Sequence, residues 1–163
     1  MRLCVLSDTH IPDRGENVPD QLLREIKASD LVIHAGDFTS LDFYQQLRKL
    51  KPLKAVLGNM DSMELRPYLK NKEFFRVLNF KIGLIHGQGQ PDRITDHLRE
   101  SFDEQPDIII FGHSHQPCQE QKGPTLFFNP GSATDKIFAP YNSYGILEIS
   151  PQGIQARIER IRE

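Results

Sequence analysis

Seven side chains of the types that bind divalent metal ions are spread over more than a hundred residues of this sequence, in five short motifs. In two motifs such residues stand in pairs with one residue between them, as Asp-Thr-His and His-Ser-His. In the other three, an aspartate, an asparagine or a histidine stands directly beside a glycine. Carboxylate, amide and imidazole groups suit metal chemistry when they meet at one point. The seven candidates are Asp8, His10, Asp37, Asn59, His86, His113 and His115.

Every motif follows a short apolar run of the kind that forms a buried strand. Residues 3–8 (LCVLSD), 31–37 (LVIHAGD) and 53–59 (LKAVLGN) end in polar residues, and so do the runs that precede the later histidine motifs. In open α/β sheets ligands bind outside the carboxyl ends of the strands, so we expect the motifs to converge at one sheet edge. We expect each neighbouring glycine to let the backbone turn sharply and to aim the ligand over that edge.

Helices are predicted between the first strands. Pro19 suits the first position of a helix over DQLLREIKAS, and Ser40 or Asp42 can cap a second helix that ends at Leu50. A strand–helix–strand–helix–strand order implies parallel pairing with right-handed crossovers. The first half of the chain is therefore expected to form one parallel sheet.

The second half of the chain, after Pro67, is rich in strands and implies a second sheet. FFRVLNFKIGLIHG is read as one or two strands with Asn79 as a turn, and Asp92–Glu104 as a helix. Three further strands are predicted at TLFFNPGSAT, SYGILEIS and GIQARIERI, the last with one face exposed to solvent. The predicted fold class is α/β: a two-sheet β-sandwich flanked by helices, with four α/β/β/α layers in one domain over residues 1–163.

Composition is that of an ordinary globular protein. The chain has 163 residues, 38% of them apolar and 26% charged, with a formal net charge of −2. That balance shows no nucleic-acid or anionic-membrane footprint, and no segment reaches the ~20 apolar residues of a membrane span. Cys4 and Cys118 are too few for a disulfide framework. We therefore expect a cytoplasmic protein without a membrane or nucleic-acid partner, and leave homo-oligomerisation open.

The number of candidate ligands points to two metal ions. One structural zinc takes four ligands, usually thiolates among them, so two carboxylates, one amide and four imidazoles are too many for it. Imidazole with carboxylate favours Zn, Fe or Mn over Ca or Mg. A single Gly-Asp or Gly-Asn pair is an ordinary turn, but five motifs in order at strand ends are hard to explain as turns. His34 is read as a core or ligand-orienting residue, and His97 as a surface residue.

The motifs resemble those of the calcineurin-like metallophosphoesterases, namely DTH (8–10), GD (36–37), GN-x-D (58–61), HG (86–87) and GHSH (112–115). With its small size and NPGSAT (129–134), the sequence is similar to the compact YfcE-type phosphodiesterase branch. The resemblance implies a two-sheet sandwich that hydrolyses a small phosphoester substrate with a metal-bridging hydroxide. From the ligand types we expect two divalent ions per chain, with Mn favoured and Ni, Zn or Fe as alternatives.

The resemblance also implies roles for individual residues. The ligands of one metal would be Asp8, His10 and His115, those of the second Asn59, His86 and His113, and the bridge Asp37. The expected catalytic residues are Asp37, Asn59 and His86. Asp61 is expected to orient a neighbouring ligand.

Met60 departs from the family pattern, because many relatives carry a histidine there that can protonate the leaving oxygen. A thioether is no general acid, and a well-placed acid contributes about 10²–10⁴-fold to a rate. We therefore expect slow hydrolysis of phosphomonoesters with poor leaving groups and better activity on activated diesters.

Some features leave alternatives open. NPGSAT is read as a turn between strands, the alternative being a loop whose N–H groups hold phosphate. Arg14 is read as a solvated loop charge, the alternative being a contact with substrate phosphate. The same fold also serves as the retromer subunit, so a non-catalytic metal-binding scaffold or interaction protein is the alternative function. The aromatics expected to be exposed, at an interface or an oligomer contact, are Phe43, Tyr44, Phe138 and Tyr141.

Overall fold

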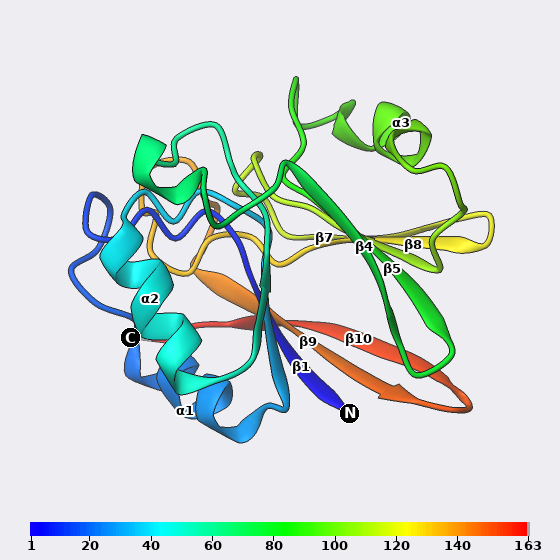
Figure 1. The fold of residues 1–163 in the computed structure, drawn as a ribbon, viewed down its shortest axis with the longest axis horizontal. Helices are drawn as coiled ribbons and strands as arrows, with labels where there is room; N and C mark the ends of the chain where they lie inside the picture. The colour runs from blue at the N-terminus through cyan, green and yellow to red at the C-terminus, as the bar shows by residue number, and fades with distance from the viewer. Residues whose placement is uncertain (163) are drawn as a thin grey trace.

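Two five-stranded sheets packed face to face form the centre of the molecule (Figure 1). The computed structural model describes residues 1–162. The first sheet, in the order β10-β9-β1-β2-β3, comprises β10 (Gly153–Arg160), β9 (Ser143–Ser150), β1 (Arg2–Leu6), β2 (Leu31–His34) and β3 (Leu53–Ala55). The second, in the order β4-β5-β6-β8-β7, comprises β4 (Lys72–Val77), β5 (Phe80–Ile85), β6 (Ile108–Ile110), β8 (Thr125–Asn129) and β7 (Cys118–Lys122).

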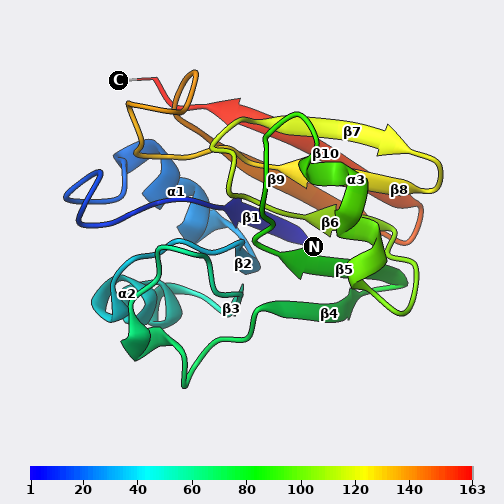
Figure 2. The same cartoon turned by 90° about the horizontal axis from the view of Figure 1, so that it is seen from above.

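Helices cover the outer faces of the two sheets. α1 (Asp20–Ala28) and α2 (Leu41–Leu50) pack against the first sheet, and α3 (Ile94–Leu98) packs against the second, on the other side of the molecule (Figures 1 and 2). Short 3-10 turns occur at Met63–Leu65 and Arg99–Ser101. The layers follow the order helix, sheet, sheet, helix, which confirms the predicted fold class. Within residues 1–162, no helix is both long enough and apolar enough to span a bilayer.

Strands in the middle of the sandwich are buried on both faces, which explains their unbroken apolar runs. In β1, Leu3 and Val5 face the second sheet, whereas Cys4 and Leu6 pack toward α1 and α2. β6 consists of three isoleucines, each 0% exposed, of which the middle one packs with α3 and the outer two face the first sheet. Burying one side chain of this size contributes about 1.5–3 kcal/mol. These runs therefore hold the strands in the centre of the sandwich.

The parallel strands bring their carboxyl ends to a common edge. β1 and β2 pair in parallel, with Leu3 opposite Leu31. β2 and β3 also pair in parallel, with Val32 opposite Leu53. β6 is parallel to both β5 and β8. β4 and β5 form the two-stranded hairpin that was allowed for around Asn79.

The later elements differ from the prediction in three ways. β9 and β10 belong to the first sheet, where β9 pairs antiparallel with β1, and not to the second. β7 was not predicted, because its sequence CQEQK has no apolar periodicity; it is an edge strand with mostly exposed side chains. The helix expected over Asp92–Glu104 is reduced to α3 and the 3-10 turn after it, since Ile94 and Leu98 carry its contacts with the sheet.

Two of the four aromatic residues expected at the surface are in the core. Phe43 is 2% exposed and Tyr44 is 6% exposed, both on the inner side of α2. The buried ring of Phe38 packs against both, with ring centroids 6.1 and 5.6 Å away. Phe138 is exposed as predicted, and Tyr141 is half-buried. The prediction for Phe43 and Tyr44 was wrong because helical periodicity alone does not determine how wide the buried face is.

Candidate metal centre

The seven candidate side chains lie together where the strands of both sheets end. β1, β2, β3, β5 and β6 are each followed by one of the five motifs. Four of the residues make the tightest group: all are buried, and one ligand atom from each lies within 4.8 Å of the others. These four are Asp8, His10, Asp37 and His115.

The other three residues form a second group beside the first. The Oδ1 atom of Asn59 lies 2.9 Å from Nε2 of His86 and 3.1 Å from Nδ1 of His113. The Oδ2 atom of Asp37 lies 3.4 Å from Nε2 of His86 and 3.5 Å from Nε2 of His10. Asp37 therefore stands between the two groups, within reach of both.

The backbone that carries these side chains adopts an uncommon conformation. Seven non-glycine residues of the described chain have positive φ, and five of them are candidate ligands: Asp8 (50°), His10 (44°), Asp37 (60°), His113 (69°) and His115 (57°). Such a conformation costs of order 1–3 kcal/mol per residue and persists where the surroundings hold it. Here the N–H of Asp8 donates to the C=O of Gly36, and the N–H of His10 to the C=O of Asp37, both at 3.0 Å. Strain of this kind collects at functional sites.

Every motif glycine was expected to allow a sharp turn, but only some of them do so. Gly36 has the positive φ of such a turn, 96°, but Gly58 and Gly112 do not. A Cβ on Gly58 would lie 2.0 Å from Oδ1 of Asp37, and one on Gly112 would lie 1.8 Å from Oγ of Ser7. At these two positions glycine is required because any side chain would collide with its neighbours.

Hydrogen bonds determine which ring nitrogen of two histidines faces the centre. Nδ1 of His86 lies 2.7 Å from the C=O of Ala35, and Nδ1 of His115 is hydrogen-bonded to the carboxylate of Asp135. A ring that donates its Nδ1–H outward presents the lone pair of Nε2 inward, the usual arrangement of a metal-binding histidine. From these contacts we assign this tautomer to both rings in the metal-bound state, in which an ion takes the place of any proton on Nε2.

The pKa shifts in the cluster follow from burial and from the contacts among its own carboxylate and imidazole groups. Burial raises the pKa of Asp8; at Asp37 burial is outweighed by the hydrogen bond and charge of His86, so its pKa is lowered. Burial lowers the pKa of His10 and of His113, which favours the neutral imidazole that binds metals. At His86, contacts with Asp37 and Asp8 outweigh burial and raise the pKa to about 9. A donor set of carboxylates, imidazoles and one amide fits divalent transition metals.

Asp135 contacts this centre and was missed by the sequence prediction. Its buried carboxylate accepts hydrogen bonds from His115, from Nη1 of Arg14 at 3.0 Å, and from the N–H groups of Ile137 and Phe138 at 2.9 and 3.2 Å. Burial opposes its charge, but the hydrogen bonds from Ile137, His115 and Phe138 outweigh burial and lower the pKa of Asp135. Its place directly after NPGSAT is the only signal in the sequence, and that signal says nothing about contact with His115.

Asp61 lies behind the ligands and contacts backbone. Its carboxylate accepts hydrogen bonds from the N–H groups of Asp37 at 3.1 Å, Thr39 at 2.9 Å and Gly58 at 2.7 Å. One side chain thus ties the loop after β2 to the loop after β3. This is the position from which a residue can orient Asp37.

His34 is fully buried at the end of β2, where its ring stacks on that of Phe38 with ring centroids 3.6 Å apart. Its Nδ1 accepts a hydrogen bond from the N–H of Gly36 at 3.2 Å, so its Nε2–H is the donor to Oγ1 of Thr9 at 3.0 Å. Burial lowers its pKa well below the usual value, so the ring stays neutral. His97 is exposed on α3, remote from these contacts.

The NPGSAT segment leads from the end of β8 into the connection to β9, as the turn reading predicted, and it also supports the ligand loops from behind. Oγ of Ser132 donates to the C=O of Asp8 at 2.6 Å, and Oγ1 of Thr134 donates to the C=O of Thr9. Nδ2 of Asn129 donates to the C=O of Gly112 at 3.0 Å. The N–H groups of residues 131, 134 and 135 are bonded within the segment, so these three are not available to phosphate.

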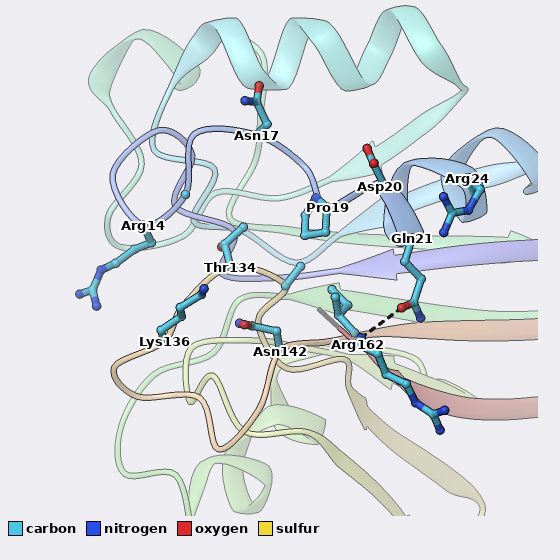
Figure 3. Close-up of a pocket in the computed structure, with 13 residues that line it drawn as sticks. Arg14, Asn17, Pro19, Asp20, Gln21, Arg24, Thr134, Lys136, Asn142 and Arg162 are labelled. Atoms are coloured by element: carbon cyan, nitrogen blue, oxygen red, sulfur yellow. Dashed lines mark hydrogen bonds between the residues drawn. The ribbon is translucent and has the colours of Figure 1, made fainter.

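A cleft of about 390 Å³ opens onto the cluster, and Arg14 forms part of its wall. Arg14 also borders a neighbouring pocket of about 510 Å³ next to α1, but its guanidinium points out of that pocket (Figure 3). The group is paired with Asp135 and lies over the ring of Phe138, 5.1 Å from the ring centroid. The reading of Arg14 as a solvated loop charge was therefore wrong.

The four-layer fold and the ligand cluster at its strand ends define a class of metal-binding phosphoesterase-like proteins, and comparison identifies the family. The chain matches the calcineurin-like phosphoesterase superfamily domain over residues 1–152 and belongs to that family. The resemblance seen in the sequence motifs is thereby confirmed.

Relatives in this family carry two kinds of name. A probable metallophosphoesterase of Methanothermobacter thermautotrophicus is 36% identical over 165 aligned positions, which cover 98% of this chain and 92% of the relative. Vacuolar protein sorting-associated protein 29 of Schizosaccharomyces pombe is 32% identical over 143 positions, covering 82% and 73%. Among solved structures, Entamoeba histolytica Vps29 complexed with Zn²⁺ has a TM-score of 0.77 at 28% identity, covering 99% and 98%.

Proposed function

We propose that this protein is a phosphoesterase that uses two divalent metal ions per chain and acts on phosphodiesters. The observation that supports the proposal most is the position of Asp37, whose Oδ2 lies within 3.5 Å of a histidine from each ligand group. A carboxylate so placed can bridge two ions. The proposed ligands of the first ion are Asp8, His10 and His115, and those of the second are Asn59, His86 and His113.

Manganese suits this donor set, with Ni, Zn or Fe as alternatives, because imidazole and carboxylate ligands without thiolate accept several ions. When bound, two such ions activate water for attack on phosphorus and neutralise charge on the phosphoryl oxygens. Family membership and the buried Asp/His cluster both support a metal-dependent reaction.

The protein's own part in this reaction is to hold the ligands and to shape the cleft. The N–H of Met60 donates to Oδ1 of Asp37 at 2.7 Å, which leaves Oδ2 directed at both ligand groups. Asn59 is a neutral ligand and leaves more positive charge on the site than a carboxylate would. The side chain of Met60 is 59% exposed at the cleft and carries no proton to donate, so good leaving groups are favoured.

The central test is hydrolysis of bis(p-nitrophenyl) phosphate by protein loaded with Mn²⁺, together with a count of bound metal. We expect two ions per chain and a loss of at least about 100-fold in turnover for Asp37→Asn. Asp107→Asn is the matched control, because Asp107 also accepts a backbone N–H, that of Lys81 at 2.7 Å, but lies outside the ligand cluster. Wild-type turnover in Asp37→Asn, or binding of fewer than two ions, would refute the two-metal assignment.

Met60→His tests the substrate preference. The variant places an imidazole at the mouth of the cleft, where it can protonate a leaving oxygen. We expect the rate on p-nitrophenyl phosphate to rise relative to the rate on the diester, by up to ~10²-fold. An unchanged ratio would mean that Met60 does not lie on the leaving-group side.

A second candidate function is that of a metal-binding interaction protein without turnover. It is favoured by the similarity to proteins named for vacuolar protein sorting, one of which was solved with Zn²⁺. Protein that binds two ions but hydrolyses none of a panel of phosphomonoesters and phosphodiesters would support this candidate over the enzyme.

A further inference from the structure

Two exposed, large apolar side chains line the cleft above the ligand cluster. Phe138 is 61% exposed and Met60 is 59% exposed, and both form part of the cleft wall. Single exposed apolar side chains are common on protein surfaces, but these two line the same cleft, and ligand sites combine apolar walls with a few polar groups. The proposed chemistry at the metals uses neither side chain.

Phe138 is held next to the proposed metal ligands. Its ring centroid lies 5.9 Å from that of His115, at an interplanar angle of 89°. Its backbone N–H donates to the buried carboxylate of Asp135, which is also hydrogen-bonded to the His115 ring. One carboxylate therefore links the backbone of an exposed aromatic residue to a ligand of the first proposed ion.

Arg14 is positioned by the same carboxylate. Its Nη1 donates to Oδ1 of Asp135 at 3.0 Å, and its side chain is 28% exposed within the cleft wall. A guanidinium has five N–H donors, and among residues 1–162 the structure gives this one a single hydrogen bond. The remaining donors can meet a phosphoryl oxygen without moving the group.

The neighbouring pocket next to α1 does not offer a comparable anion site. It is lined by Arg24 and Arg162 as well as Arg14, but the three guanidinium groups lie apart and do not converge on one point (Figure 3). Phosphate recognition needs donors that converge on one point. The cleft with Phe138, Met60 and Arg14 is therefore the better-formed ligand site.

We propose that Phe138 and Met60 form a subsite for a flat aromatic group of the substrate, while Arg14 binds a phosphoryl oxygen. The inference rests on the proposed function and narrows it to phosphoesters that carry an aromatic ring, either a nucleobase or an aryl group. Stacking on an aromatic side chain and contact with a thioether both favour a flat polarisable ring over an alkyl chain. Arg14 binds the phosphoryl group, which all phosphoesters share, and its guanidinium also supports one face of the Phe138 ring.

The test compares two ligands that differ only in the ring, phenylphosphonate and methylphosphonate, by calorimetric titration of the Mn²⁺-loaded protein. Base stacking on an aromatic residue changes affinity by roughly 5- to 150-fold, so we expect phenylphosphonate to bind about 10-fold more tightly. Phe138→Ala should bring the ratio of the two affinities close to 1, and Phe138→Tyr should restore it. Arg14→Ala should weaken both ligands, and phenylphosphonate at least as much as methylphosphonate, because the guanidinium also lies over the ring of Phe138. Ile137→Ala is the matched control, since Ile137 is 71% exposed and is not among the residues that line the cleft.

The outcomes separate the subsite from the proposed function. Equal affinity for the two phosphonates in the wild type, or an unchanged ratio in Phe138→Ala, would overturn the subsite and leave the metal site intact. Failure of both phosphonates to bind the metal-loaded protein would instead count against the phosphoesterase. A second pair, thymidine 5′-monophosphate and 2-deoxyribose 5-phosphate, distinguishes the source of the ring: a Phe138-dependent preference for the nucleotide identifies a nucleobase, and its absence identifies an aryl ester.

Discussion

Asp135→Asn is the substitution that tests most directly how the ligand cluster is held. The buried carboxylate accepts hydrogen bonds from four donors, on His115, Arg14, Ile137 and Phe138. An amide has one oxygen, so it can serve the donors on one side and presents an NH₂ group to those on the other. The ring of His115 then loses either its partner or the negative charge that makes Nε2 a good ligand.

The expected loss is worked from these contacts. Removing a hydrogen-bonded carboxylate behind a metal-binding histidine lowers metal affinity by about 10- to 100-fold, or about 1.4–2.7 kcal/mol. The metal-free protein loses about 1–3 kcal/mol of stability because a buried donor is left unsatisfied. Two effects of separate origin are thus expected, one on binding and one on folding.

The assay is titration of metal-free protein with Mn²⁺ by calorimetry, paired with thermal unfolding with and without the ion. We expect weaker binding and a smaller increase in Tm on adding Mn²⁺ in Asp135→Asn than in the wild type. Asp107→Asn should lower the Tm of both forms equally and leave the affinity unchanged. Wild-type Mn²⁺ affinity in Asp135→Asn would refute the argument that this carboxylate orients His115 for metal binding.

Three further predictions concern other parts of the molecule. Gly58→Ala should abolish binding of at least one ion, as counted by metal analysis, because its Cβ would lie 2.0 Å from Oδ1 of Asp37; two ions bound would contradict this. Glu25→Gln should lower the free energy of unfolding by about 1–2 kcal/mol at pH 7, since Glu25 contacts Arg2 through both carboxylate oxygens, at 2.6 and 3.0 Å. The hydrogen bond from Arg2 lowers the pKa of Glu25 despite burial, so this contribution is present above about pH 4.5 and is lost as the pH falls through the folded-state pKa; a difference from wild type that persists in acid would oppose this reading. Cys4 is 0% exposed and burial raises the pKa of its thiol, so it should not react with a disulfide reagent at pH 8 until the protein unfolds. Rapid reaction of Cys4 as well as Cys118 in the folded protein would show that β1 opens.

Much of the site was predictable because its residues follow strands that are recognisable locally. Apolar runs that end in polar residues located β1, β2 and β6, and the rule that parallel strands present their carboxyl ends at one edge then placed Asp8, Asp37 and His113 together. The family resemblance added the division of ligands between two ions, which remains a proposal. Met60 could be recognised as unusual because its neighbours matched a motif.

The sequence did not reveal features that depend on which residues meet across the fold. Asp135 reaches His115 across 20 residues and Arg14 across 121, contacts that no local pattern records. Phe43 and Tyr44 looked like surface residues until the packing of α2 buried them. β9 and β10 joined the first sheet because β1 offered an open edge to an antiparallel partner.

The sequence by itself determined which chemical groups are present and that they stand at the ends of buried strands, because hydrophobic periodicity is a local property of the chain. Only the tertiary structure decided their geometry. The five positive φ values, the close packing at Gly58 and the carboxylate that joins His115, Arg14 and Phe138 all depend on contacts between segments distant in sequence. Such contacts exist only once the two sheets are packed, and packing is what holds the strained ligand loops in place.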